Sequence, residues 1–360
     1  MSSVNSVQTS TRVLWIDFLR GLAVLGMIEA HSVNSFLAPI YRVGFGFEII
    51  SYINGWVAPT FLFIAGLLQG AWVRKNWDTP KPLASKLRSL AVILLIGYAL
   101  QFPWDSVLDG QKVLLALGKV DVLHCIALSL AALLLLSRVF KKVISYDLLV
   151  LFLAIALVIA SPFVWKYMAA ITEVNPLVGY VSPHRGALFP LFPWSAFLFA
   201  GTLASRWLCD NPKSKESAQT FAILFVLTAA FGWILRAWLG DWFGAQTYAT
   251  RYDFFCFRLS LVFLGCSLCA LLVSNQQPGR VTLAINWCGS RSLSLYVWHL
   301  VILHSGLGLV PALRSIFPKI QTPSTVVWLY LLTLGGTLLL TWFWQKLLVI
   351  FVQRRERACS

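Results

Sequence analysis

The chain has 360 residues, of which 58% are hydrophobic and only 12% are charged. A soluble globular domain has about 25% charged residues, so the composition excludes an ordinary soluble protein and indicates one embedded in lipid. The net charge of +15 is scattered over short loops, which excludes a concentrated nucleic-acid-binding surface and fits the basic bias of cytoplasmic loops in membrane proteins.

Long apolar segments recur along the chain at the length of membrane-spanning helices. A helix needs about 20 residues to cross the hydrocarbon layer, whereas a spanning strand needs about 10 residues with alternating faces, and the sequence lacks that alternation. We therefore predict an all-α fold, a polytopic transmembrane helical bundle of about ten helices. The predicted helices cover residues 13–36, 52–73, 87–104, 121–138, 146–165, 187–207, 217–238, 254–274, 286–305 and 325–352.

Lys and Arg are unevenly distributed among the predicted loops. The segments after the second, fourth and sixth helices and the C-terminal tail are basic, and the alternate loops are poorer in Lys and Arg. The positive-inside rule places the basic loops and both termini in the cytoplasm. We predict a short polar segment at 1–12, a single membrane-embedded domain at 13–352 and a basic cytoplasmic tail at 353–360, in the cytoplasmic (inner) membrane of a bacterium.

The first predicted helix carries four ionisable residues, Asp17, Arg20, Glu29 and His31. Such groups are costly inside a membrane and need partners or a polar cavity. At about 100° per residue, Arg20 and His31 fall within about 20° of one azimuth and about 16 Å apart along the axis, with Asp17 close to the same stripe. An ion pair between Asp17 and Arg20 that only holds the bundle together is the simpler alternative, although it does not explain His31.

Histidines are the candidate catalytic bases, because a neutral imidazole can take a proton from a hydroxyl or amine and return it to a leaving thiol. All five, His31, His124, His184, His299 and His304, map to the outer half of the predicted bundle. His31 is the first candidate. His124 follows Asp121 by three residues, so that the acid could orient its ring, and His299 is a further candidate. The alternatives are a packed polar residue at the membrane interface for His31, a structural hydrogen bond between helices for His124, and a structural role for His299.

Cationic residues on the cytoplasmic side are predicted to bind a phosphate-bearing donor, because guanidinium groups suit phosphate. These residues are Arg12, Arg20, Arg74, Lys75 and Arg88. Their alternative role is the topology signal itself. We expect no metal ion, because no His, Asp or Glu cluster has ligand spacing on one helix face.

Polar residues on the outer side are predicted to contact an acceptor substrate. The candidates are His184, Arg185, Glu29 and Tyr296. Arg236, Arg251 and Arg258 could also hold an anionic or sugar acceptor, with snorkelling to the interface as the alternative.

Two segments resemble each other within the chain. Residues 59–66 read Pro-Thr-Phe-Leu-Phe-Ile-Ala-Gly, and residues 193–201 read Pro-Trp-Ser-Ala-Phe-Leu-Phe-Ala-Gly, with one additional residue. Both segments enter the predicted bundle from the outer side. A shared ancestry of two halves is one explanation, and chance similarity of apolar segments is the other.

Several motifs occur in order along the chain. The opening Arg12, Asp17, Arg20 and Gly21 is followed by a helix-end His31, and further motifs lie at residues 58–66, 121–128, 189–194 and 292–299. Taken in this order, they resemble the heparan-alpha-glucosaminide N-acetyltransferase catalytic-domain family and, more distantly, bacterial integral-membrane O-acyltransferases of surface sugars. The resemblance implies that the 13–352 domain transfers an acyl group across the membrane from acyl-CoA, such as acetyl-CoA, to a sugar amine or hydroxyl.

One motif departs from the animal members of that family. They place a histidine just before a Trp-Asn-Gly-like segment, whereas here Asn54, Gly55 and Trp56 have no histidine closely before them. The heparan substrate itself is therefore not carried over.

The sequence thus favours an acyl-CoA-dependent acyltransferase, with His31 as base, Asp17 and Arg20 along the donor path, and Asp121, His124 and His299 as further catalytic candidates. The expected partners are the lipid bilayer, acyl-CoA and a sugar or glycolipid acceptor, and no nucleic acid; a homo-oligomer is left open. A transporter or channel whose intramembrane charges line a substrate or proton path is the alternative from another class.

Overall fold

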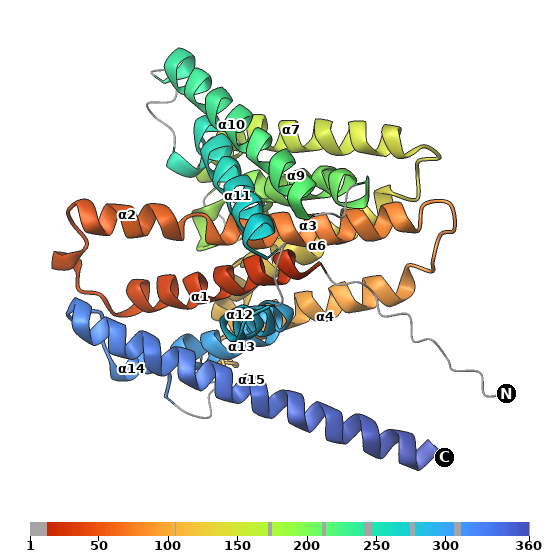
Figure 1. Cartoon of the computed structure of the whole chain (residues 1–360). Coiled ribbons are helices and arrows are strands. Elements are labelled where there is room, and N and C mark those ends of the chain that lie inside the picture. The colour runs from red at the N-terminus through yellow and green to blue at the C-terminus, as the bar shows by residue number, and fades with distance from the viewer. Residues whose placement is uncertain are drawn as a thin grey trace.

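A computed structural model describes residues 13–104, 106–171, 175–210, 214–240, 247–273, 278–305 and 311–359. Within these ranges the chain consists of helices and their connections, with one isolated backbone bridge between Leu37 and Gln321. The predicted all-α bundle is confirmed (Figure 1).

The longer helices, in chain order, are α1 (Leu14–Phe36), α2 (Phe45–Asn54), α3 (Val57–Lys75), α4 (Ala84–Gln101), α5 (Gly110–Leu117), α6 (Val122–Leu136), α7 (Val143–Ala169), α9 (Leu191–Asp210), α10 (Ser214–Leu239), α11 (Tyr252–Val273), α12 (Arg280–Ser290), α13 (Ser292–Leu300) and α15 (Pro323–Cys359). Short helical turns connect them: η1 (Pro39–Tyr41), α8 (Leu177–Val181), η2 (Pro183–Arg185), η4 (Tyr248–Thr250), η5 (Val301–Ser305) and α14 (Leu313–Ile316).

Six helical segments in the described ranges are long and apolar enough to cross a membrane. They are Phe45–Lys75, Ala84–Gln101, Val143–Ala169, Lys215–Leu239, Tyr252–Val273 and Pro323–Phe351, and the bent pair of α5 and α6 adds a seventh if it counts as one span. The helix α1 has 23 residues and α9 has 20, which is long enough to cross a membrane, but neither is apolar enough to count among these spans. Each of the ten predicted segments is helical, although only part of them qualify as spans by composition.

The ends of the helices divide the bundle into two sides. In Figure 1, α1 begins, α3 ends, α4 begins and α15 ends toward the right, and the connection from α1 to α2 and the start of α15 lie at the left. We call the side where α1 begins the inner side and the opposite one the outer side. The start of α1 and the end of α15 thus both lie on the inner side, in agreement with the predicted topology.

The outward faces of α7, α10 and α15 are apolar. Their exposed side chains include Leu148, Phe152, Ile155 and Ile159 on α7, Ile223, Val226, Leu227 and Trp233 on α10, and Trp328, Leu332, Leu339 and Phe343 on α15. Such surfaces would be costly in water, because apolar area is driven out of contact with it. They are the lipid-facing surface of a membrane protein.

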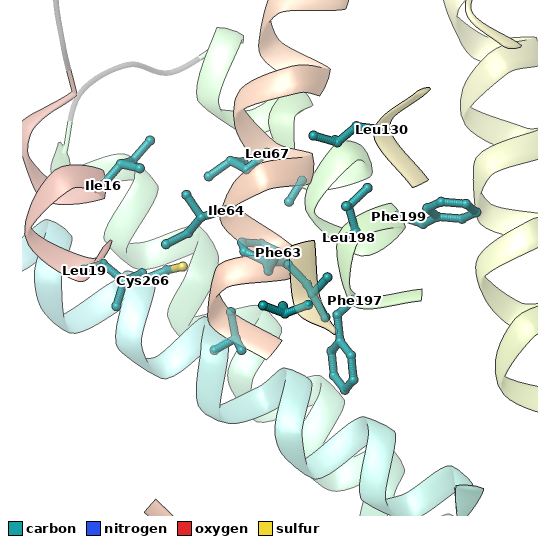
Figure 2. Close-up of a cluster of buried hydrophobic side chains, with 14 of the residues drawn as sticks. Ile16, Leu19, Phe63, Ile64, Leu67, Leu130, Phe197, Leu198, Phe199 and Cys266 are labelled. Carbon is teal, nitrogen blue, oxygen red and sulfur yellow. The ribbon is translucent and has the colours of Figure 1, made fainter. Parts of the chain in front are cut away.

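The core lies where α1, α3, α9 and α11 meet. Figure 2 shows Ile16 and Leu19 from α1, Phe63 and Leu67 from α3, and Cys266 from α11, which come together in one cluster. All five side chains are almost completely buried. This cluster holds α1, which carries the candidate base, in a fixed position.

The two segments that resemble each other in sequence pack against each other in the fold. A Cβ atom placed on Gly66 of α3 would lie 1.9 Å from the backbone oxygen of Leu198, and one on Gly201 of α9 would lie 1.9 Å from that of Phe63. The contact is therefore reciprocal, with a glycine from each helix against the backbone of the other. Small residues at such crossings let membrane helices approach closely. The sequence similarity thus corresponds to a matched pair of helices.

Three features differ from the predicted elements. The second segment begins at Phe45 rather than at 52 and is interrupted at Gly55 and Trp56, and α5 was not predicted at all. The ninth segment is broken at Arg291, whose backbone (φ −119°, ψ 21°) is not helical, and it ends in the π-helical turn η5. Wider π-helical turns are frequent at functional sites, and this one carries His304.

Candidate active site

Arg20 lies one third of the way along α1 and joins it to α13. Its Nη1 is 3.4 Å from Oδ1 of Asp17, and its Nη2 donates a 2.6 Å hydrogen bond to Oγ of Ser292. The predicted ion pair between Asp17 and Arg20 is therefore present, and both side chains remain partly exposed. The pair is long for a charge-assisted bond, so the shorter contact, to Ser292, sets the direction of the guanidinium.

His31 lies at the outer end of α1, among other imidazoles. The centroid of its ring is 5.1 Å from that of His299 and 5.9 Å from that of His304, both in edge-to-face geometry. Within the described residues its ring nitrogens have no hydrogen-bond partner. The ring lines two cavities. It is thus positioned by packing, while its nitrogens stay available to a substrate.

His299 lies behind His31 and is completely buried. Its Nδ1 is 3.1 Å from the backbone oxygen of Leu295, to which it donates, and its Nε2 has no partner within the described residues. The neutral tautomer protonated on Nδ1 satisfies this arrangement. His304 Nε2 lies 3.5 Å from Oγ of Ser35, which brings the end of α1 and η5 together.

Asp121 connects three elements at the start of α6. As the residue that caps this helix, it accepts a 2.7 Å hydrogen bond from the backbone N–H of Val122 on Oδ1. Its Oδ2 accepts a 2.5 Å hydrogen bond from the hydroxyl of Tyr296 on α13 and a 3.4 Å bond from the amide of Gln101 on α4. A carboxylate at a helix N-terminus is favoured by the helix dipole as well as by these donors.

The predicted pairing of Asp121 with His124 exists, but its geometry differs from a base held by an acid. Nδ1 of His124 accepts a 3.2 Å hydrogen bond from the backbone N–H of Asp121, and its Nε2 is buried without a partner. The ring packs edge-on against Tyr98 at 4.5 Å and lies under Gly97. His124 therefore completes the cap of α6, a structural role that is local to this helix.

Three adjacent cavities run from the level of Arg20 to the outer side. The inner cavity, about 400 Å³, is lined by residues that include Arg20, Gln69, Lys86, Val122, Ser292 and Tyr296. The middle cavity, about 450 Å³, is lined by residues that include Ile50, Phe61, Val122, Tyr296, His31 and Asp121. The outer cavity, about 900 Å³, is lined by residues that include His31, Asp121, His304, Lys119, Arg314 and Lys319.

Shared walls connect these cavities. Phe61, Val122 and Tyr296 line both the inner and the middle cavity. His31 and Asp121 line both the middle and the outer cavity. The hydrogen bond between Tyr296 and Asp121 thus lies where all three cavities approach one another.

The predicted donor-binding cations occupy different environments. Arg12 lies outside the described residues. Lys75 and Arg88 are exposed on the inner side, and Arg20 lines the inner cavity. Arg74 makes two hydrogen bonds, of 2.7 and 3.1 Å, to Asp147 and one of 3.0 Å to Ser205, which ties α3 to α7 and α9. A role for Arg74 in donor binding stays a prediction, and a donor phosphate would have to compete with Asp147 for this guanidinium.

Three of the four predicted acceptor-binding residues do not line the three cavities. His184 contacts the backbone oxygen of Trp165 at 3.1 Å, and Arg185 donates to that of Ile171 at 3.0 Å. Glu29 is half-buried on α1 and is not part of the walls of the three cavities. Tyr296, in contrast, lines two of them.

Of the other outer arginines, Arg251 and Arg258 are bound within the protein, whereas Arg236 is exposed. Arg251 makes hydrogen bonds of 3.0 and 2.7 Å to Asp253. Arg258 is buried, donates to the backbone oxygen of Tyr52, and lies over the rings of Tyr52 and Phe254. A side chain at Gly55 would collide with this guanidinium, which explains why a glycine stands there.

Sequence reasoning did not select several residues that line the cavities. Lys86 at the inner cavity was counted only as a loop charge, and Gln101, Lys119, Arg314 and Lys319 at the outer cavity were not considered. They come from four separate segments, so no spacing in the sequence could have grouped them. In the part of the chain that the structure describes, no three His, Cys, Asp or Glu side chains converge as a metal ion would require.

Comparison with known families assigns the chain. The profile of a family described as an acyltransferase domain matches residues 13–342, nearly the entire chain. The chain belongs to this acyltransferase domain family. With its apolar helices, the protein is an integral membrane acyltransferase. Comparison with curated proteins and with solved structures gives no match.

Membership of this family favours an enzyme over a transporter or channel. The match covers the helix with Arg20 and His31 as well as the segments with Asp121, Tyr296 and His299. It supports a membrane acyltransferase in general, which is broader than the resemblance to the heparan-alpha-glucosaminide N-acetyltransferase family. The donor and acceptor of this acyltransferase do not follow from the match.

Proposed function

We propose that the protein transfers an acyl group from acyl-CoA on the cytoplasmic side to a hydroxyl or amine of a sugar or glycolipid on the outer side of a bacterial cytoplasmic membrane. The observation that carries this proposal is the series of adjacent cavities, which begins at Arg20 and ends at His31. These residues are eleven positions apart on one helix, about 16 Å along its axis. An acyl-thioester arm could follow that path, whereas the charged nucleotide would stay at the inner side.

The inner cavity suits the phosphate-bearing end of the donor. Lys86 lies at its wall with the ammonium 4.9 Å from the ring centre of Trp72, and Arg20 lies deeper, directed by Ser292. Ammonium and guanidinium groups both bind phosphate, the latter in two-pronged geometry. Beyond Arg20 the walls are mainly apolar, with Ile64, Leu90 and Ile126 among them, which suits an uncharged acyl arm.

The chemistry assigned to His31 is that of a general base and then a general acid. Its imidazole takes the proton of the acceptor hydroxyl or amine as the oxygen or nitrogen attacks the thioester carbonyl. A new C–O or C–N bond forms, the C–S bond breaks, and the same imidazole returns the proton to the leaving thiolate to give free CoA. The unbonded ring nitrogens of His31 are what allow both transfers.

The neighbouring histidines position this base. His299 is fixed by its bond to Leu295 and packs edge-on against His31, and His304 packs on the same ring. Such contacts restrict the ring to one orientation, and general acid–base catalysis depends on this geometry before it depends on pKa. His299 and His304 are therefore positioning residues in this proposal.

The experiment uses the full chain in nanodiscs with labelled acetyl-CoA and a panel of sugar and glycolipid acceptors. We expect His31→Gln to lower the rate of acyl transfer by about 10² to 10⁴-fold, the range for loss of a general base, with unchanged thermal unfolding. Lys112→Gln is the control, because Lys112 is exposed, pairs with Asp109 and lies outside the walls of the three cavities, and it should retain activity. Full activity in the His31 variant would refute the role of this base.

A further inference from the structure

The wall of the outer cavity carries three cationic side chains, Lys119, Arg314 and Lys319. Lys119 lies between α5 and α6, Arg314 is on α14, and Lys319 lies in the loop before α15. All three are exposed. They share this cavity with His31 and His304, so the positive charge lies beside the candidate base.

Backbone hydrogen bonds at two places hold the segments that carry these cations. The backbone N–H of Ala38 donates to the oxygen of Gln321 at 3.0 Å, and that of Gln321 donates to the oxygen of Phe36 at 3.0 Å, which fixes the loop before α15 to the end of α1. The oxygen of Val120, next to Lys119, accepts from Leu188 and Phe189. The cations are therefore presented by anchored loops.

Nearby acids do not neutralise this charge. Within the described residues, none of Lys119, Arg314 and Lys319 forms an ion pair. Among the described residues that line the outer cavity, Asp121 is the one carboxylate, and its oxygens already accept bonds from Val122, Tyr296 and Gln101.

A fourth cation increases the positive potential. Arg42 donates to the backbone oxygens of Leu37, Val33 and Asn34 at the end of α1, so its charge is fixed there. Slight desolvation and the positive charges of Arg42 and Arg314 lower the pKa of Lys319. A bound anion would relieve this mutual repulsion.

The positive-inside rule does not explain why Lys119, Arg314 and Lys319 are basic, because they lie on the outer side. Outer loops of membrane proteins are normally poor in Lys and Arg, because basic residues favour the cytoplasmic side. Three such residues around one outer cavity run against that bias, so they require another explanation. The remaining polar residues of the wall, among them Asn34, Ser35, Gln101 and Ser315, are neutral hydrogen-bonding groups suited to a hydroxylated molecule.

We propose that the acceptor carries an anionic group, a phosphate or a carboxylate, which Arg314, Lys319 and Lys119 hold in the outer cavity while its hydroxyl or amine meets His31. This inference rests on the proposed acyl transfer and adds the chemical class of its acceptor. These residues differ from the outer arginines singled out in the sequence: Arg251 and Arg258 are bound within the protein, and Arg236 does not line the outer cavity.

Direct binding tests this inference without activity. The full chain in nanodiscs of zwitterionic phosphatidylcholine is titrated with glucose 1-phosphate, glucuronate and glucose. We expect the two anionic sugars to bind roughly tenfold more tightly than glucose, the size expected for a few exposed charge pairs. The difference should shrink as salt rises from about 0.05 to 0.5 M, because exposed charges are screened.

Variants assign the effect to this cavity. In the triple variant Lys119→Gln, Arg314→Gln and Lys319→Gln, the anionic sugars should bind no better than glucose, while glucose binding stays the same. Lys112→Gln is the matched control on neighbouring α5, because Lys112 is exposed but lies 3.5 Å from Asp109 and outside this cavity wall. A preference for anionic sugars that survives in the triple variant, or no preference in the native protein, would overturn the proposal.

A lipid-linked probe separates two sources of the anion. Decyl phosphate-linked glucose is compared with methyl phosphate-linked glucose, because both are phosphodiesters of equal charge that differ only in the alkyl chain, which the apolar part of the middle cavity, near Ile50 and Phe61, could accept. Tighter binding of the decyl probe than of the methyl probe, with the same loss in the triple variant, assigns a lipid-linked acceptor. Equal binding of the two assigns a water-soluble one, and both results support the anionic class.

The same preparations keep the two proposals apart. Charge-dependent binding without acyl transfer to any acceptor would count against the proposed function and leave the anion site standing. Equal acyl transfer to neutral and anionic acceptors would support the function and overturn the site. His31→Gln should retain the binding preference, because His31 contributes no fixed charge to the site.

Discussion

The side chain of Asp121 shows how one residue can serve both fold and site. Its carboxylate caps α6 and receives the hydroxyl of Tyr296, while Tyr296 lines the inner and middle cavities. This hydrogen bond thus joins the first turn of α6 to α13 beside His31. The bond is short, as expected for a hydroxyl that donates to an ionised acceptor.

Removal of that hydroxyl should weaken the fold measurably. In Tyr296→Phe, Oδ2 of Asp121 keeps only the 3.4 Å contact from Gln101, so a buried carboxylate loses its best donor. We expect the free energy of unfolding to fall by roughly 1–3 kcal/mol, the cost of an under-satisfied buried group. Thermal unfolding in detergent measures the change.

Tyr330→Phe is the matched control for this substitution. Tyr330 lies on α15, and within the described residues its hydroxyl makes no hydrogen bond, so its loss should have little effect on thermal unfolding. Equal loss of stability in both variants would show that the bond to Asp121 is not the source of the effect.

At the scale of single residues, the sequence could predict which side chains belong to α1 but not what they contact. The spacing of Arg20 and His31 follows from helical geometry alone, and the structure places both at cavity walls. The partners of Asp121 come from α4 and α13, far away in the chain, so their contacts depend on tertiary packing. The ring of His124 instead makes a local bond, to the backbone N–H of Asp121 and not to its carboxylate, so its role as a catalytic candidate stays a prediction.

Among the helices, the packing of α4 on α6 depends on a glycine. A Cβ atom on Gly97 would lie 2.9 Å from Cε1 and 3.0 Å from Nδ1 of the completely buried His124 ring. Real Cβ atoms essentially never approach so closely, and the ring cannot move without losing its bond to the backbone N–H of Asp121. The absence of a side chain at residue 97 thus permits the cap of α6.

We therefore expect opposite effects from alanine at two helical glycines. Gly97→Ala should destabilise the protein by about 1–3 kcal/mol through overpacking. Gly335→Ala on α15 meets nothing within 4 Å and should be neutral or stabilise by up to about 1 kcal/mol, because alanine favours helix more than glycine does. Apparent melting temperatures of the two variants, measured in the same detergent, make the comparison, and a drop for both would contradict it.

Elements were predictable where apolar length decided them. The helix predicted at 146–165 lies within α7, because the segment Val143–Ala169 is apolar over a length sufficient to cross a membrane. The break at Arg291 and the π-helical turn at Val301–Ser305 were missed, since both depend on how α12 and α13 pack on α1. A glycine at residue 289 is the sequence feature that could have indicated this packing. A Cβ atom there would lie 1.7 Å from the backbone oxygen of Asp17, because α12 and α1 approach closely at this point.

For the whole molecule, the direction of transfer depends on which side faces the cytoplasm. The distribution of Lys and Arg predicts that the inner side faces the cytoplasm. Val43 and Leu108 are strongly exposed on the outer side, and Lys141 is exposed on the inner side. Single cysteines at these positions can report the orientation directly.

The described native cysteines make this measurement practicable. Cys125, Cys256, Cys266, Cys269 and Cys288 are free and buried, so a membrane-impermeant maleimide should hardly react with them. Cys209 and Cys359, whose side chains lie outside the described residues, are replaced by serine. In intact cells we expect Val43→Cys and Leu108→Cys to react and Lys141→Cys to react only after the membrane is permeabilised.

The reverse labelling pattern would contradict the proposed direction of acyl transfer. It would put the inner cavity, with Arg20 and Lys86, on the side without cytoplasmic acyl-CoA, and it would expose the outer cavity to the cytoplasm. The chemistry of His31 could remain, but the acyl group would then have to come from a donor outside the cytoplasm. The labelling experiment therefore tests the direction of transfer independently of any acceptor, before a single turnover is measured.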